Sequence, residues 1–292
     1  SISSPIIKIA ITAIALGVMI MLIAVATGAG LQYKIRDKMA GFKGHIQIVN
    51  YDNNNSEVST TPVQKNQDFY PKFENISGIK NIQVFANKAG ILRTKTDFEG
   101  IIFKGVSSDY DWTFFKEYLV AGKVPDFNQP RTREVLLSET IVNRLELQLN
   151  DTILATFLKT SMSKLPSNKK YIISGIYNSG FAQFDKSVMI GDIREVQKLN
   201  KWSENEVGGF EVLLDNFDEI QLKGDEIYTQ IGATLNRKTI VDAYPNVFEA
   251  RKSSCTPSTD GTNSKTIKVA KAKPQAMVIT IGSRNCACTL VS

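Results

Sequence analysis

Cysteine is absent from residues 1–250 of this 292-residue chain, and histidine occurs once, as His45. The cysteine-free part is therefore no disulfide scaffold, and it suits an oxidising compartment and the cytosol equally well. The three cysteines lie at positions 255, 286 and 288. With one distant histidine they form a poor ligand set, so the sequence predicts no metal site. His45 begins a predicted strand, and we expect it to have a structural or surface role.

The same 250 residues carry no net charge. The formal net charge of the chain is +6, and the last 42 residues hold seven basic residues against the single acidic residue Asp260. These residues account for the whole excess, and they contain no Phe, Tyr or Trp. A neutral domain has no electrostatic footprint for nucleic acid, so we expect no nucleic-acid partner.

Motifs for catalysis and cofactors are also missing. The chain has no G-x-x-x-x-G-K-[ST] loop for ATP and no dinucleotide fingerprint. Ser161-Met-Ser-Lys164 matches the S-x-x-K nucleophile motif, but the partner motifs S-D-N and K-T-G do not occur. The sequence therefore predicts a protein that is not an enzyme and that binds no cofactor itself.

One long apolar run is present. Residues 9–30 carry no charge, and as a helix they would extend over about 33 Å, the thickness of a bilayer core. A cleaved signal peptide is the alternative, because Ala24-Val-Ala26 resembles a cleavage site. Apolar residues then recur every four positions from Leu31 to Met39. This spacing favours a retained transmembrane helix over 9–30 that continues as a stalk helix over 31–43.

Small residues recur at four-residue spacing in this span, as Ala13/Gly17 and Ala24/Gly28. Such pairs let membrane helices pack closely, although chance in an alanine-rich segment explains them equally well. More basic residues follow the span than precede it, which alone would place the following domain in the cytoplasm. The chain starts without methionine, so we expect further residues upstream of a short cytoplasmic segment, 1–8.

Beyond the stalk, strands and helices alternate irregularly, which is typical of the α+β class. Turn residues, N-caps and hydrophobic periodicity define the elements. The predicted strands cover 45–49, 81–96, 99–106, 134–137, 152–158, 171–177, 210–214 and 238–243, and the predicted helices cover 71–77, 139–147, 192–199 and 217–231.

One stretch points to a family. Residues 172–186 read Ile-Ile-Ser-Gly-Ile-Tyr-Asn-Ser-Gly-Phe-Ala-Gln-Phe-Asp-Lys. They resemble the G-I-Y-x-x-G-x-x-x-x-D region of lipoprotein-releasing (Lol-type) ABC transporter permeases, in the MacB/FtsX-like permease family. Ser4–Ala10, Gly41–Ile46 and Leu136–Thr140 look similar too. The family usually has glycine where this chain has Asn150, a tolerable change at a turn. The resemblance covers residues 1–250.

This resemblance implies a topology. The transmembrane helix would run from cytoplasm to periplasm of the bacterial inner membrane, since large domains cross regardless of flanking charge. A MacB-like periplasmic core domain of two α/β lobes would follow. The porter-like lobe would take 44–106 and 207–249, and the sabre-like lobe would take 107–206. The family would continue into three further membrane helices, so we interpret the atypical tail, 250–292, as a frameshift product or as a disordered tail.

The resemblance also implies a function. The chain would be a permease subunit that couples ATP hydrolysis in a partner subunit, which binds ATP and Mg, to extraction of lipoproteins from the membrane. Its partners would be that ATP-binding subunit, a second permease subunit or a second copy, the lipoprotein, a periplasmic carrier and membrane lipid. MacB-like efflux, FtsX-like regulation of a cell-wall hydrolase, and a singly anchored periplasmic binding domain are the alternatives. Phe181 and Phe184 could be exposed anchors for a partner, with Tyr177 beside them, although core packing is the competing interpretation.

Overall fold

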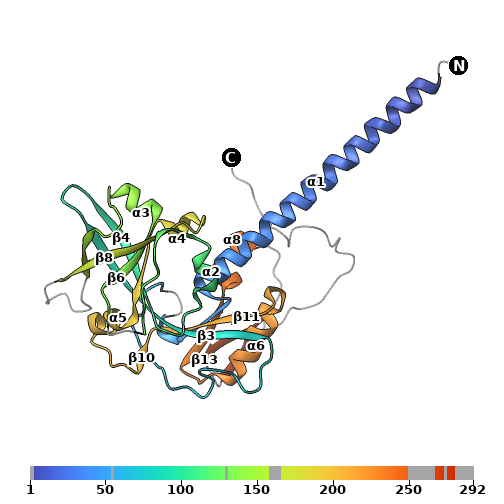
Figure 1. Ribbon diagram of the computed structural model, residues 1–292. Coiled ribbons are helices and arrows are strands. Elements are labelled where there is room, and N and C mark those ends of the chain that lie inside the picture. The colour runs from blue at the N-terminus through green and yellow to red at the C-terminus, as the bar shows by residue number, and fades with distance from the viewer. Residues whose placement is uncertain are drawn as a thin grey trace, which may run out of the picture.

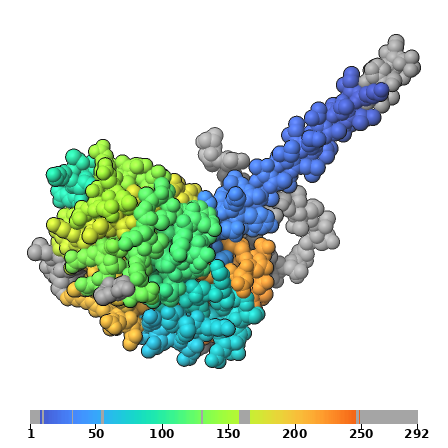
Figure 2. Space-filling model, in the orientation of Figure 1, coloured from blue at the N-terminus to red at the C-terminus, as the bar shows by residue number. Residues whose placement is uncertain are grey.

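The structure, a computed structural model, describes residues 3–53, 56–128, 131–157, 166–248, 267–272 and 275–279. Its first element is α1 (Ser3–Lys43), a single helix of 41 residues. Figure 1 shows α1 projecting as a straight rod from one side of a domain rich in β-strands. In Figure 2 most of this rod stands clear of the domain, and only its last turns are covered.

The exposed part of α1 has the composition of a membrane span. Among the described residues, one helix is long and apolar enough to cross a bilayer, within 11–43, and the mean hydropathy of its most apolar window is 2.4. Large apolar side chains such as Ile14, Met21 and Ile23 are 59–69% exposed. An apolar helix with no protein around it needs another apolar environment, and a bilayer supplies one.

The domain contains one large mixed sheet and several short helices. The strands are β1 (Ile46–Asn50), β2 (Val63–Gln64), β3 (Ile79–Arg93), β4 (Phe98–Val106), β5 (Leu119–Gly122), β6 (Glu134–Ser138), β7 (Thr152–Phe157), β8 (Ser167–Tyr177), β9 (Val188–Asp192), β10 (Glu206–Val207), β11 (Gly209–Leu214) and β12 (Leu235–Thr239). The helices are α2 (Trp112–Lys116), α3 (Glu139–Arg144), α4 (Ala182–Asp185), α5 (Ile193–Asn200), α6 (Ile220–Gln230), α7 (Ile240–Ala243) and α8 (Pro245–Phe248).

The ten-stranded sheet has the order β12-β1-β11-β3-β4-β9-β6-β8-β5, and β7 branches off it to pair with β3 and β8. The long strand β3 has three partners in this sheet, and its residues 90–93 pair with β7. Its residues 79–85 pair with β11, while 85–93 pair with β4. Strands from 44–106 and from 209–239 thus lie together at one end of the sheet, and the strands of 119–192 lie beyond them. The lobe boundaries themselves stay a prediction.

Two groups of buried side chains fill the domain. The larger group packs along the sheet and includes Ile48, Phe103 and Tyr171, each fully buried. The smaller group is mostly aromatic and surrounds Phe42, at the end of α1. Because the second group includes a residue of the stalk (residues 31–43), the helix end is part of the folded domain.

Several predicted local features are confirmed. Ser138 caps α3, because its Oγ accepts the Ile141 amide at 3.2 Å, and Asp192 caps α5 through the Arg194 amide at 2.9 Å. Asn150 adopts the left-handed conformation with φ 69°, as its turn position suggests. The hairpin of β3 and β4 forms around Asp97 as predicted.

Two predicted elements are wrong. Residues 71–77 form no helix. Phe73 and Ile76 are instead buried in the larger core group, and Phe73 stacks on Phe69 at 5.0 Å. Burial of these side chains outweighs a weak helical preference. The strand predicted over 238–243 ends at Thr239, which is the N-cap of α7. Thr239 Oγ1 accepts the Asp242 amide at 3.1 Å, and Asp242 Oδ2 accepts the Thr239 amide at 3.2 Å, a capping box.

Other predictions fall at the edge of what the structure describes. In the tail, β13 (Ile267–Ala272) and β14 (Gln275–Ile279) pair as an antiparallel hairpin. The rest of 250–292 lies outside the described residues, and so does Ser161–Lys164. The origin of the tail therefore stays a prediction.

Candidate functional site at the base of the stalk

The end of α1 is held in a socket of aromatic rings. Phe42 is 1% exposed. Five rings lie within 6.3 Å of its ring centroid, namely those of Phe114, Phe115, Tyr118, Tyr177 and Phe184. At Gly41 an added Cβ would lie 2.2 Å from the Phe114 ring, so only glycine allows the helix to approach this closely. The socket fixes the helix to α2, β8 and α4.

A buried ion pair fixes the same helix end to the sheet. Lys104 Nζ lies 2.7 Å from Glu211 Oε1, and the two side chains are 5% and 1% exposed. The same ammonium donates to the backbone carbonyl of Phe42 at 2.7 Å. This carbonyl is at the negative end of the helix dipole, where a cation stabilises it. Burial lowers the pKa of Lys104, and the Glu211 carboxylate opposes that shift.

Both carboxylate oxygens of Glu211 also accept hydrogen bonds from glutamine side chains. Gln83 Nε2 donates to Oε2 at 3.0 Å and Gln47 Nε2 donates to Oε1 at 3.2 Å. Gly44, with φ 76°, turns the chain out of α1 here, and a Cβ at this position would lie 2.9 Å from Glu211 Cβ. The network therefore joins α1 to β1, β3, β4 and β11.

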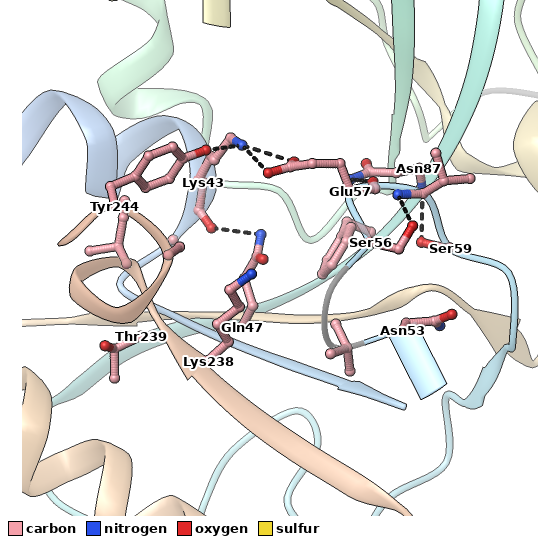
Figure 3. A pocket seen from close by; sticks show the side chains of 16 residues that line it. Lys43, Gln47, Asn53, Ser56, Glu57, Ser59, Asn87, Lys238, Thr239 and Tyr244 are labelled. Carbon is pink, nitrogen blue, oxygen red and sulfur yellow. Dashed lines mark hydrogen bonds and ion pairs between the residues drawn. The ribbon is translucent and has the colours of Figure 1, made fainter. Parts of the chain in front are cut away.

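A second lysine closes the site on its exposed side. The Lys43 ammonium lies 3.0 Å from Glu57 Oε2 and also donates to the Tyr244 hydroxyl. Figure 3 shows the three side chains meeting above a cleft whose walls include Gln47, Asn53 and Thr239. The cleft continues past Lys43 into a second hollow of about 120 Å³, which Phe181 and Gln183 line.

Farther along the stalk, Arg36 packs against two aromatic rings of the domain. Its guanidinium lies 5.4 Å from the Phe217 ring centroid and 5.9 Å from that of Phe248. Such cation–π contacts contribute about 0.5–1 kcal/mol each where water reaches them. They bring α8 beside the stalk, so the α7–α8 segment (residues 240–248) lies against α1.

The stretch that carries the family resemblance has a structural explanation. The Asp185 carboxylate accepts the Ser179 hydroxyl at 2.6 Å, the Ser179 amide at 3.1 Å and the Gly180 amide at 3.1 Å. Gly180 has φ 67°, which glycine adopts at little cost. The glycine and the aspartate of the motif therefore hold the 178–181 turn in place, beside Lys38 of the stalk.

The predicted partner-binding residues separate into two kinds. Phe184 and Tyr177 are 2% and 0% exposed, so the expectation that Phe184 is an exposed anchor is wrong. Both are part of the socket around Phe42, which sequence reasoning could not bring together from positions so far apart. Phe181 is partly buried and packs edge-on against Tyr244 at 6.1 Å. Binding of a partner at Phe181 stays a prediction.

The small residues of the span lie on one side of α1. Positions 13, 17, 24 and 28 fall within a wedge of about 60° at 100° per residue. No atom of the described residues approaches within 4 Å of a Cβ placed at Gly17 or Gly28. Helix packing through Ala13, Gly17, Ala24 and Gly28 therefore stays a prediction.

His45 lies just beyond the stalk, where its role is structural. Its Nδ1 accepts the Leu214 amide at 3.2 Å, and its ring faces Phe217 at 5.7 Å. Burial, and then the positive charge of Lys80, lower the pKa of His45 to about 4. Among the residues that the structure describes, no group of three or more His, Cys, Asp or Glu could hold a metal ion.

We expect the domain to lose stability as pH falls from 6.5 to 4, through His45. The pKa in the unfolded chain is 6.5 and in the folded chain about 4, so the unfolded state binds the extra proton between these values. The free energy of unfolding should fall by about 2–3 kcal/mol over this window. Urea unfolding of a His45→Gln variant, which keeps an acceptor, should show a smaller loss. An equal loss in both proteins would contradict this role.

Comparison with known proteins identifies the family. The model of the MacB-like periplasmic core domain matches residues 9–230. The solved extracellular domain of the noncanonic ABC-type transporter YknZ from Gram-positive bacteria aligns with 66% of this chain and 99% of its own, at 14% identity and a TM-score of 0.42. The periplasmic region of MacB from Actinobacillus actinomycetemcomitans aligns with 70% of this chain and 92% of its own, at 14% identity and a TM-score of 0.44. No curated protein shows a significant match. Because the family model covers well over half of the chain, this protein belongs to the family with a MacB-like periplasmic core domain, that of ABC-type permeases of the MacB/FtsX-like class.

Proposed function

We propose that this chain is a permease subunit of a lipoprotein-releasing ABC transporter, anchored in the bacterial inner membrane with its domain in the periplasm. A domain of this family is not itself catalytic, and membership of an ABC-type transporter implies a separate ATP-binding subunit. The continuity of α1 is the observation that carries the proposal. One unbroken helix contains both the apolar span and Phe42, whose ring fills the aromatic socket of the domain.

The proposed mechanism is mechanical. ATP hydrolysis in the partner subunit moves the membrane helices, and α1 passes this motion to the domain. A helix transmits motion only if its end is fixed, and here three sets of contacts fix it. Phe42 fills the socket, Lys104 binds the Phe42 carbonyl, and Arg36 packs on Phe217 and Phe248. The domain then acts on the lipoprotein or on its carrier.

Lipoprotein as the substrate rests on the sequence resemblance around Gly175–Asp185. In the structure this motif shapes the 178–181 turn. Phe181, the last residue of that turn, is partly accessible. An apolar ring on a turn held by Asp185 is suited to bind an apolar group of a carrier or substrate. Efflux of small molecules and regulation of a cell-wall hydrolase are the alternative functions, and an experiment must distinguish them from lipoprotein release.

We expect a Phe181→Ala variant to bind a periplasmic lipoprotein carrier about tenfold or more weakly than the parent chain does. The reason is the loss of the accessible ring, while the Asp185 contacts that hold the turn remain. Binding would be measured by biolayer interferometry with the full chain in lipid nanodiscs. Phe98→Ala is the matched control, because Phe98 is 74% exposed and lies at the end of the β3–β4 hairpin and not on this turn.

ATP-dependent transfer of a fluorescent lipoprotein from proteoliposomes to the carrier then tests the activity. The chain would be reconstituted with its ATP-binding subunit. Transfer in the parent protein and its reduction in Phe181→Ala are expected. Transport of a small amphiphile without lipoprotein transfer would overturn the proposal in favour of efflux.

A further inference from the structure

The two lysines at the base of the stalk differ in how firmly they hold their partners. Lys104 and Glu211 are 5% and 1% exposed, whereas Lys43 and Glu57 are 19% and 60% exposed. A buried pair costs about 3–5 kcal/mol to break, because one charge is left without a partner inside the protein. A pair that water reaches contributes only about 0.2–1 kcal/mol. One contact is therefore permanent and the other can be exchanged for water.

The exposed contact joins three segments that are far apart in sequence. Lys43 is the last residue of α1, Glu57 belongs to the 56–62 loop, and Tyr244 belongs to the α7–α8 segment. The backbone of the loop is also tethered to β3, because Asn87 Nδ2 donates to the Glu57 carbonyl at 3.0 Å and the Ser59 amide donates to the Asn87 carbonyl at 3.0 Å. The Tyr244 ring also lies 5.1 Å from the Lys43 ammonium. Release of the ammonium would thus free the helix end from the loop and from Tyr244 together, while the contact of Arg36 with Phe248 stays.

Space for this release exists on both sides of Lys43. A hollow of about 30 Å³ and another of about 120 Å³ share the five lining residues Lys43, Gln47, Glu57, Asn87 and Tyr244. The Lys43–Glu57 pair therefore lies between two hollows that share their lining. A side chain that swings out of this position meets open space and not packed core.

We propose that Lys43, Glu57 and Tyr244 form a releasable latch, which holds the 56–62 loop and the α7–α8 segment to the stalk and opens when α1 moves. The proposal rests on the proposed function, in which α1 transmits motion. When the latch opens, the two hollows merge into one cleft, while the Phe42 socket and the Lys104–Glu211 pair keep the helix end attached. The latch gives the domain two arrangements around a fixed attachment point.

Hydrogen exchange of the full chain in nanodiscs tests the latch without the ATP-binding subunit. In Glu57→Gln and Tyr244→Phe, amides of 56–62 and 240–248 should exchange about two- to fivefold faster than in the parent chain. Amides of β3, β4 and β11 should be unchanged. Asp52→Asn is the matched control, because it removes an exposed carboxylate from the preceding turn without affecting the latch. Lys43→Arg should restore most of the protection that Lys43→Met loses.

Salt provides the second measurement. Raising ionic strength from about 0.01 M to about 1 M shortens the screening length roughly tenfold, so exchange in both segments should speed up in the parent chain but not in Glu57→Gln. Exchange that is equal in Glu57→Gln, Tyr244→Phe and Asp52→Asn would overturn the latch. Faster exchange that includes β3, β4 and β11 would also overturn it, since the contact would then belong to the permanent attachment. Because no transport is measured, either result leaves the permease assignment to be judged separately.

Discussion

Replacing Lys104 by methionine is expected to lower the free energy of unfolding of the domain by about 3–5 kcal/mol. The substitution leaves the Glu211 carboxylate, 1% exposed, without a cation, and the Phe42 carbonyl loses its donor. The cost is that of an uncompensated buried charge, added to a helix end without a hydrogen-bond partner. Urea unfolding followed by tryptophan fluorescence measures it, because both tryptophans, Trp112 and Trp202, lie in the domain.

Lys88→Met is the matched control for this experiment. Lys88 lies on β3 and is 9% exposed, and none of the described residues forms an ion pair with it. Burial lowers the pKa of this lysine, so its removal should be nearly neutral or stabilising. A Lys104→Met/Glu211→Met double variant should regain part of the loss, although Gln47 and Gln83 then lack their acceptor. A loss below about 1 kcal/mol in Lys104→Met would show that the pair is not the attachment described above.

Truncating Phe42 to alanine should cost about 3–5 kcal/mol, the range for a large aromatic side chain in a core. Five rings lose a neighbour, and the cavity lies where α1 enters the domain. The same unfolding experiment measures this loss. In addition, a protease should cut the stalk faster in the variant, since the helix end is no longer held. Phe98→Ala, at a 74% exposed position, should change stability by less than about 0.5 kcal/mol, and equal losses in both variants would contradict the socket.

Local chemistry made much of the fold predictable. The caps at Ser138 and Asp192 and the turn at Asn150 depend on neighbours within three residues, and all three form as predicted. Predictions fail where distant contacts decide the outcome. The 71–77 segment is irregular because Phe73 and Ile76 are buried in the core. The end of the strand at Thr239 was missed although its cause is local, since Asp242, three residues on, completes a capping box.

The base of the stalk was largely hidden from sequence reasoning. Lys104 and Glu211 are 107 residues apart, and each is a single charge within an otherwise apolar run of its strand, so nothing in the sequence pairs them. Tyr177 and Phe184 belong to the motif that carried the family resemblance, which suggested surface recognition. The structure places both rings around Phe42. A clue was available in Gly41-Phe42-Lys43-Gly44, where two glycines flank the residues that enter the domain.

Strand β3 has a consequence for how the two parts of the domain can move. Its 15 residues form one unbroken strand that pairs with β11 in its first half and with β4 in its second. At about 3.3 Å per residue it is about 50 Å long. It lies in the predicted porter-like lobe, and its residues 90–93 also pair with β7 of the predicted sabre-like lobe. The two predicted lobes therefore share one sheet at this point, and swinging them apart would break the β3–β7 and β4–β9 ladders. Force that enters at Phe42 reaches both predicted lobes at once, because its ring packs on Tyr177 and Phe184 of one lobe and its carbonyl accepts from Lys104 of the other.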